Sequence, residues 1–123
     1  MKGSQMIEPA DIREWRNHEV VDSGNHKIGT LESVYVDTAS DLPAMATVEI
    51  GIPTRHRLVF VPIDSAVVGP GYVKVAYDKA MVKGGPSIGP DDILPAENEE
   101  AIFQHYGMTY SPGAAGERQL ARR

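Results

Sequence analysis

Alternating apolar and polar residues recur in short stretches along the chain, and turn-forming residues separate these stretches. Such period-two alternation is typical of strands with one buried face. We expect strands at 20–21, in a long stretch that ends at Asp37, and at 44–52, 58–63, 66–68 and 72–77. Because the connections are short, strands that are adjacent in sequence should be adjacent in space. The pattern therefore predicts a meander of about six strands.

The first two strands form the clearest unit, a β-hairpin. Its turn is Asp22-Ser23-Gly24-Asn25, a run of residues that tolerate positive φ or hydrogen-bond their own backbone. Gly29 lies inside the second strand, where a missing Cβ usually marks a bulge, a bend or the close approach of another backbone. A strand that bends in this way is typical of a β-barrel.

The stretch from Leu58 to Ile63 is the most apolar strand, and both of its alternate sets of side chains are hydrophobic. A small barrel buries only one face of each strand inside itself, so the outer face needs a cover. We expect a C-terminal helix to cover part of this face and a second copy of the protein to cover the rest. The predicted dimer or partner surface consists of Leu58, Phe60 and Tyr35.

The C-terminal helix is predicted from Pro95 to Gly107. Proline opens its first turn, acidic residues follow at the positive end of the helix dipole, and glycine ends it. Ile102, Phe103 and Tyr106 form the apolar stripe that should dock on the barrel.

The remaining segments complete the expected domain organisation. Residues 1–10 are expected to be a disordered lead, 11–110 a single domain, and 111–123 a flexible C-terminal tail. Residues 11–16 could form one helical turn in which Trp15, the only tryptophan, plugs one end of the barrel. A further single turn is expected at 79–82.

The run from Val21 to Asp37 resembles the opening hairpin of the PRC-barrel family, which occurs in the photosynthetic reaction-centre H subunit and in the ribosome maturation factor RimM. The resemblance continues through 58–62 with Ala66, through 75–79, and through 99–107. It implies an all-β fold, a small and partly open PRC-type barrel with a C-terminal α-helix packed on it. It also implies a protein-binding or assembly module without catalytic residues.

Composition narrows the function classes. The chain has 123 residues, 41% of them hydrophobic, a formal net charge of −5 and no cysteine. The absence of cysteine excludes disulfides and thiolate metal sites. No apolar run reaches the roughly 18 residues of a membrane span, so we expect a soluble, cytoplasmic protein. The negative charge argues against general binding to nucleic acid.

Candidate catalytic and metal-binding groups are sparse. Asp22, His26 and Asp37 flank the hairpin, but no nucleophile motif accompanies them, and turn formation explains Asp22 and His26 more simply. The acidic residues at 37 and 41 lack the remaining positions of a calcium loop, and no histidine pair has helical zinc spacing. No glycine-rich nucleotide motif occurs. We therefore expect neither an enzyme nor a metal or cofactor.

The densest basic spot before the tail is Arg55-His56-Arg57, which we expect to form a turn. With Lys27 or Lys74 nearby, this turn could bind an anion or an acidic partner. The leading hypothesis is a non-enzymatic assembly or adaptor protein, homodimeric, that uses this turn and the open barrel end.

Three alternatives stay open. An RNA- or ribosome-associated factor would require the basic turn to converge with Arg118, Arg122 and Arg123. A small-ligand binder or enzyme would need a pocket at the barrel end near Trp15 and His26. An accessory role in a membrane photosynthetic or electron-transport complex would follow the H-subunit resemblance, although this chain lacks the membrane helix of that subunit.

Overall fold

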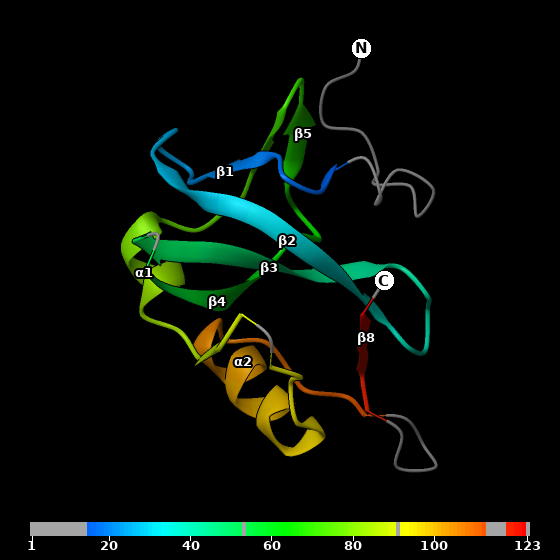
Figure 1. Cartoon of the computed structure of the whole chain (residues 1–123). Coiled ribbons are helices and arrows are strands. Elements are labelled where there is room, and N and C mark those ends of the chain that lie inside the picture. The colour runs from blue at the N-terminus through cyan, green and yellow to red at the C-terminus, as the bar shows by residue number, and fades with distance from the viewer. Residues whose placement is uncertain (1–14, 53, 91, 113–117, 123) are drawn as a thin grey trace.

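The computed structural model describes residues 15–52, 54–90, 92–112 and 118–122. Within these ranges eight strands form one curved sheet, and short helices pack against it (Figure 1). The strands are β1 Glu19–Val21, β2 Lys27–Asp37, β3 Pro43–Ile52, β4 Arg55–Pro62, β5 Val67–Gly69, β6 Tyr72–Lys74, β7 Ser87–Ile88 and β8 Leu120–Arg122. The helices are α1 Lys79–Lys83 and α2 Glu99–His105, which the 3-10 helix η2 Ala96–Asn98 precedes.

The sheet is open, with strand order β5-β6-β1-β2-β3-β4-β7. This arrangement, with a short C-terminal helix, confirms the expected all-β, partly open fold. The expected meander holds only from β1 to β4, whose neighbours pair antiparallel. The β5–β6 hairpin instead joins the far edge, where β6 pairs in parallel with β1. One physical reason is that β7 occupies the free edge of β4, so that β5 cannot lie there.

Strand β2 organises the sheet because it pairs with three other strands. Its first residues face β1, most of its length faces β3, and its last three residues, Tyr35–Asp37, face β8. Gly29 lies where β3 approaches most closely, since a Cβ atom built there would be 2.2 Å from the carbonyl oxygen of Glu49. The expectation of a close backbone approach at Gly29 is therefore confirmed.

Two hydrophobic clusters fill the protein. Val59 and Val61 of β4 belong to the first cluster and Phe60 belongs to the second, as expected for alternate side chains of a strand buried on both faces. Trp15 is only 4% exposed and lies in the first cluster, which confirms it as a core residue. The other residues of the expected helical turn before it, 11–14, lie outside the described residues, as does the lead 1–10.

Helix α2 docks as its apolar stripe predicts. Ile102 and Phe103 are buried in the second cluster, whereas Tyr106 reaches the first cluster. The hydroxyl of Tyr106 donates a 2.6 Å hydrogen bond to the carbonyl oxygen of Phe60 on β4. Gly107 has φ +69°, the left-handed conformation that glycine adopts at low cost after a helix. The regular helix is shorter than predicted, because the chain from 96 to 98 is 3-10.

The C-terminal tail needs a correction. We expected residues 111–123 to be flexible, but Leu120–Arg122 form β8 and Leu120 is fully buried. The low apolar content of the segment did not indicate a strand, because the partners of this strand lie elsewhere in the chain, in the second cluster and at Glu99, Asp37 and Glu32. Residues 113–117 and 123 lie outside the described ranges.

The contact between Tyr106 and Phe60 gives a first prediction. Tyr106→Phe removes the hydroxyl that joins α2 to β4, and we expect the free energy of unfolding to fall by about 1 to 2 kcal/mol. Urea denaturation measures this change. The matched control is Tyr72→Phe, because the Tyr72 side chain is 37% exposed at the surface, and it should change stability by less than about 0.5 kcal/mol. Equal effects of the two substitutions would contradict the proposed anchor.

Candidate binding surfaces

The predicted basic turn is not a turn. Arg55, His56 and Arg57 are the first three residues of β4, so their side chains alternate between the two faces of the sheet. His56 Nδ1 lies 3.1 Å from a carboxylate oxygen of Glu49 on β3. The Arg57 guanidinium donates to the carbonyl oxygen of Lys83, at the end of α1. The strand therefore separates the predicted patch into parts that serve different surfaces.

His56 lines one hollow of about 400 Å³ at the end of the sheet. Lys27, which we expected beside the basic residues, lines the same hollow, as does Glu49. Lys79 also contributes, a residue that sequence reasoning missed because 52 positions separate it from Lys27. Lys74 does not line this hollow. The structure thus gathers two lysines and one histidine around a polar depression.

The predicted dimer surface is covered within one chain. Leu58, Phe60 and Tyr35 are 3%, 1% and 6% exposed. Tyr35 and Phe60 pack edge to face, 5.4 Å between ring centroids, in the second cluster. The side chains that cover this cluster are Leu94, Ile102, Phe103 and Leu120. These three residues therefore cannot meet a second copy while α2 and β8 stay in place.

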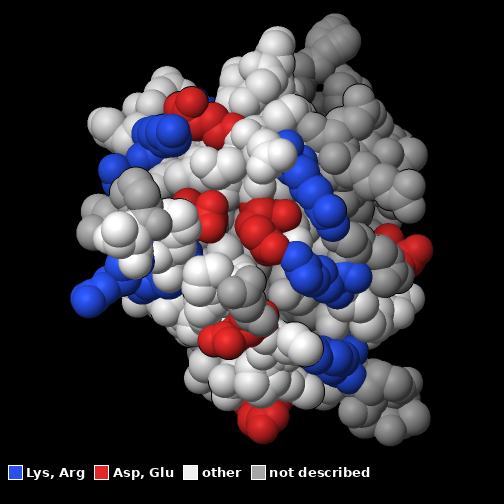
Figure 2. All heavy atoms as spheres, viewed as in Figure 1, with Lys and Arg blue, Asp and Glu red and all other residues white. Residues whose placement is uncertain are grey.

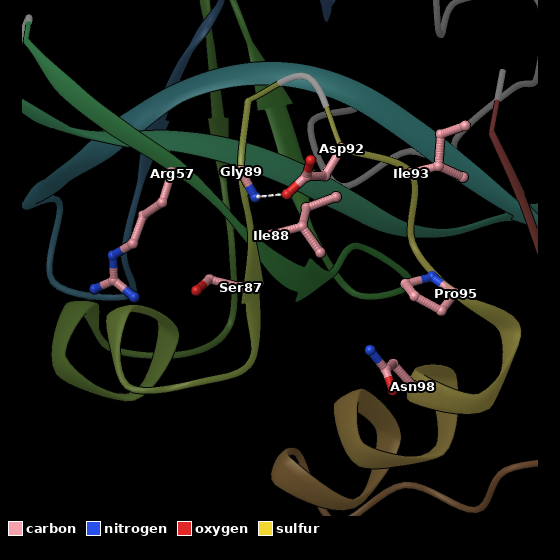
Figure 3. Close-up of a pocket in the computed structure, with 8 residues that line it drawn as sticks. All are labelled: Arg57, Ser87, Ile88, Gly89, Asp92, Ile93, Pro95 and Asn98. Atoms are coloured by element: carbon pink, nitrogen blue, oxygen red, sulfur yellow. Dashed lines mark hydrogen bonds between the residues drawn. The ribbon is translucent and has the colours of Figure 1, made fainter.

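Among the residues that the structure describes, Ile93 is the most exposed large hydrophobic residue, at 84% exposure, compared with 50% for Leu42. Ile93 lies between two hollows and lines both of them. We call residues 92–93 the Ile93 ridge. The next residue, Leu94, is 2% exposed, and the Asp92 carboxylate accepts a 3.0 Å hydrogen bond from the Gly89 backbone (Figure 3).

The first hollow beside the ridge has a volume of about 480 Å³. Figure 3 shows Arg57 on one side, Ser87 and Ile88 in the middle, and Pro95 and Asn98 on the side of α2. The second hollow is about 270 Å³ and lies between the ridge and β8; its other lining residues are Tyr35, Leu94, Arg118, Leu120, Ala121 and Arg122. No periodic pattern of apolar residues marks the ridge, because it lies in an irregular segment.

Asp22 and His26 serve the hairpin turn. The Asp22 carboxylate accepts hydrogen bonds from the backbone nitrogens of His26, Gly24 and Lys79, and the His26 ring lies 3.2 Å away. These bonds, that from the His26 backbone first, lower the pKa of Asp22 from 3.8 to about 2. Asp37 lies at the other end of the 11-residue strand β2. The three residues considered as a catalytic group are therefore not brought together.

The pocket considered for a small ligand, near Trp15 and His26, is not among the hollows described here. Trp15 is in the core and the His26 side chain is 74% exposed, and neither lines the three hollows described above.

Among the described residues no group of three or more histidine, aspartate or glutamate side chains could hold a metal ion. No helix in the described ranges is long and apolar enough to cross a membrane.

The arginines considered for RNA binding pair within the protein. Arg118 forms an ion pair with Glu99, and Arg122 forms one with Glu32. Arg123 lies outside the described residues. On the face in Figure 2, acidic side chains lie next to the basic ones. The convergence that the RNA hypothesis requires is not present in the described part of the chain.

The lowered pKa of Asp22 predicts how stability depends on pH. A carboxylate with a lower pKa in the folded state stabilises the protein above its unfolded pKa and loses this effect as pH falls through the folded value. The free energy of unfolding should therefore fall between about pH 4 and pH 2, and Asp22→Asn should make this fall shallower. Urea denaturation at several pH values measures it. An unchanged slope in the variant, or the same change in the exposed control Asp64→Asn, would contradict the assignment.

Comparison with known proteins gave one match. The family model of the PRC-barrel domain matches residues 10–82, more than half of the chain, and covers β1 to β6 with most of α1. No curated protein and no solved structure matched. The matched part contains the bent hairpin and both faces of β4, whereas α2 and β8 lie beyond it. The chain belongs to the PRC-barrel family.

Proposed function

We propose that this protein is a non-enzymatic assembly or adaptor module of the cytoplasm that binds another protein through the Ile93 ridge. The observation that carries the proposal is the 84% exposure of an isoleucine that lines two neighbouring hollows. A convex apolar side chain between two concave surfaces is a shape that a partner can complement on both sides. Binding hot spots lie where a side chain is fully desolvated in a well-packed partner pocket.

The surroundings of the ridge indicate what kind of partner fits. Arg57 lines the first hollow, and its guanidinium donates a hydrogen bond to the carbonyl oxygen of Lys83. Among the described residues, no ion pair joins this guanidinium to a carboxylate. Ile88 and Pro95 add apolar surface to the same hollow. A partner with an apolar pocket for Ile93 and an acidic group at its rim would therefore match both features.

The other hypotheses have less support. Arg118 and Arg122 are bound by carboxylates, so the RNA-associated role has no assembled basic patch in the described residues. The hollow around Lys27, Lys79 and His56 is polar and could hold an anionic group of a partner. This hollow lacks an exposed apolar anchor, and we therefore place the principal contact at the ridge.

Affinity capture from the native cells, followed by mass spectrometry, tests the proposal. Ile93→Asp should reduce the captured amount of the partner about tenfold or more, because it places a charge in the centre of the interface. Leu42→Asp, at another exposed large hydrophobic residue, 50% exposed, is the matched control and should keep the partner. Both variants should keep the urea midpoint of the unmodified protein, because both side chains are exposed.

Two outcomes would contradict the proposal. The first is capture of the same proteins in the same amounts by Ile93→Asp and the unmodified protein. The second is an equal loss of the partner in Leu42→Asp, which would show a general effect of surface charge.

A further inference from the structure

The segment from Arg118 to Arg122 lies in a groove that the rest of the chain forms. One wall is the edge of β2, where Val36 faces Ala121 in the antiparallel register (Figure 1). The floor is the second hydrophobic cluster, which receives the fully buried side chain of Leu120. The segment thus enters the protein as a strand that adds to an existing sheet edge.

Acidic residues outside the segment hold its basic ends. The fully buried Glu99 carboxylate accepts hydrogen bonds from Arg118 Nε and from the backbone nitrogen of Gln119, the latter 3.0 Å long. At the other end Arg122 pairs with Glu32. The groove therefore selects a strand with arginine, leucine and arginine at alternate positions, and the chain itself carries this pattern at 118, 120 and 122.

The two ends of the connection to this segment lie side by side. The backbone nitrogen of Ser111 donates a 2.6 Å hydrogen bond to the side-chain oxygen of Gln119. The six residues 112–117 therefore join two points of the chain that lie close together. Fully extended, the seven Cα–Cα steps from Ser111 to Arg118 could span about 23 Å, so the connection could reach a groove of a neighbouring molecule up to that distance away.

We propose that Arg118–Arg122 exchanges between two copies of this chain, so that each copy receives the strand of the other in its groove. The contacts of Leu120, Glu99 and Arg122 are the same in the exchanged and the unexchanged form, because the exchange replaces only the chain to which residues 118–122 are joined. Exchange of an identical element is a low-cost route to a closed twofold dimer.

The exchange also explains how a homodimer can form although Tyr35 and Phe60 are buried. In the exchanged dimer, Leu120 of the second copy packs on these two side chains, and no exposed sheet face is needed. The Ile93 ridge keeps the same neighbours in both forms, so this inference does not depend on the proposed partner.

Cysteine pairing tests the exchange directly, because the natural chain has no cysteine. Val36→Cys and Ala121→Cys are made in separate full-length chains. Facing residues of an antiparallel pair have Cα atoms about 4.5 to 5.5 Å apart, within the range of a disulfide. The two variants are unfolded together, refolded at high concentration and mildly oxidised. We expect a disulfide-linked dimer in the mixture, and a much smaller amount, at least tenfold less, with either variant alone.

Two controls make the result decisive. The double variant with both cysteines in one chain should form the internal disulfide at low concentration. If it does so while the mixture gives no covalent dimer, the proposal is overturned. If neither the mixture nor the double variant forms a disulfide, light scattering of the unmodified protein decides. A dimer that becomes monomeric in Leu120→Asp supports the exchange. A protein that stays monomeric up to several hundred micromolar overturns it.

Discussion

Burial of strand β4 on both faces is the constraint on which the rest of this structure depends. Val59 and Val61 fill the cluster on one face of the strand, and Phe60 between them fills the cluster on the other. A sheet of this size cannot close around both sets of side chains, so one face requires a cover from outside the sheet. The protein supplies this cover from its own C-terminal third, through α2 and β8.

The buried carboxylate of Glu99 joins these two elements. It lies in the first turn of α2 and accepts hydrogen bonds from Tyr110, Arg118 and the backbone of Gln119. A buried carboxylate is costly unless its oxygens are bonded, and here several donors satisfy them. The position of β8 and the position of α2 are therefore coupled, although the interaction lies beyond the matched PRC-barrel region.

Local patterns in the sequence sufficed for the existence of the first four strands, the close backbone approach at Gly29 and the docking stripe of α2. The strands and the stripe follow from the period of apolar positions, and a glycine inside a strand is itself a signal of close backbone approach. The same reasoning could not place β8, because Arg122 finds its carboxylate partner 90 positions earlier, at Glu32. Nor could it place β6 beside β1, a pairing between segments about 50 residues apart.

The candidate site was predictable only in part. Sequence reasoning found Lys27 and His56, which share a hollow, but treated Arg55 to Arg57 as a turn and so missed the alternation that separates His56 from Arg57. It also missed Ile93, because an isolated apolar residue in an irregular segment carries no periodic signal.

The central claim is that the C-terminal strand is part of the hydrophobic core. The free energy of unfolding of Leu120→Ala, compared with that of Leu42→Ala, measures this most directly. Leu120 is fully buried, so its truncation should cost about 2 to 5 kcal/mol, whereas the half-exposed Leu42 should cost well below 1 kcal/mol. A stability of Leu120→Ala equal to that of the unmodified protein would contradict the account, because it would show that the segment from 118 to 122 contributes nothing to the fold.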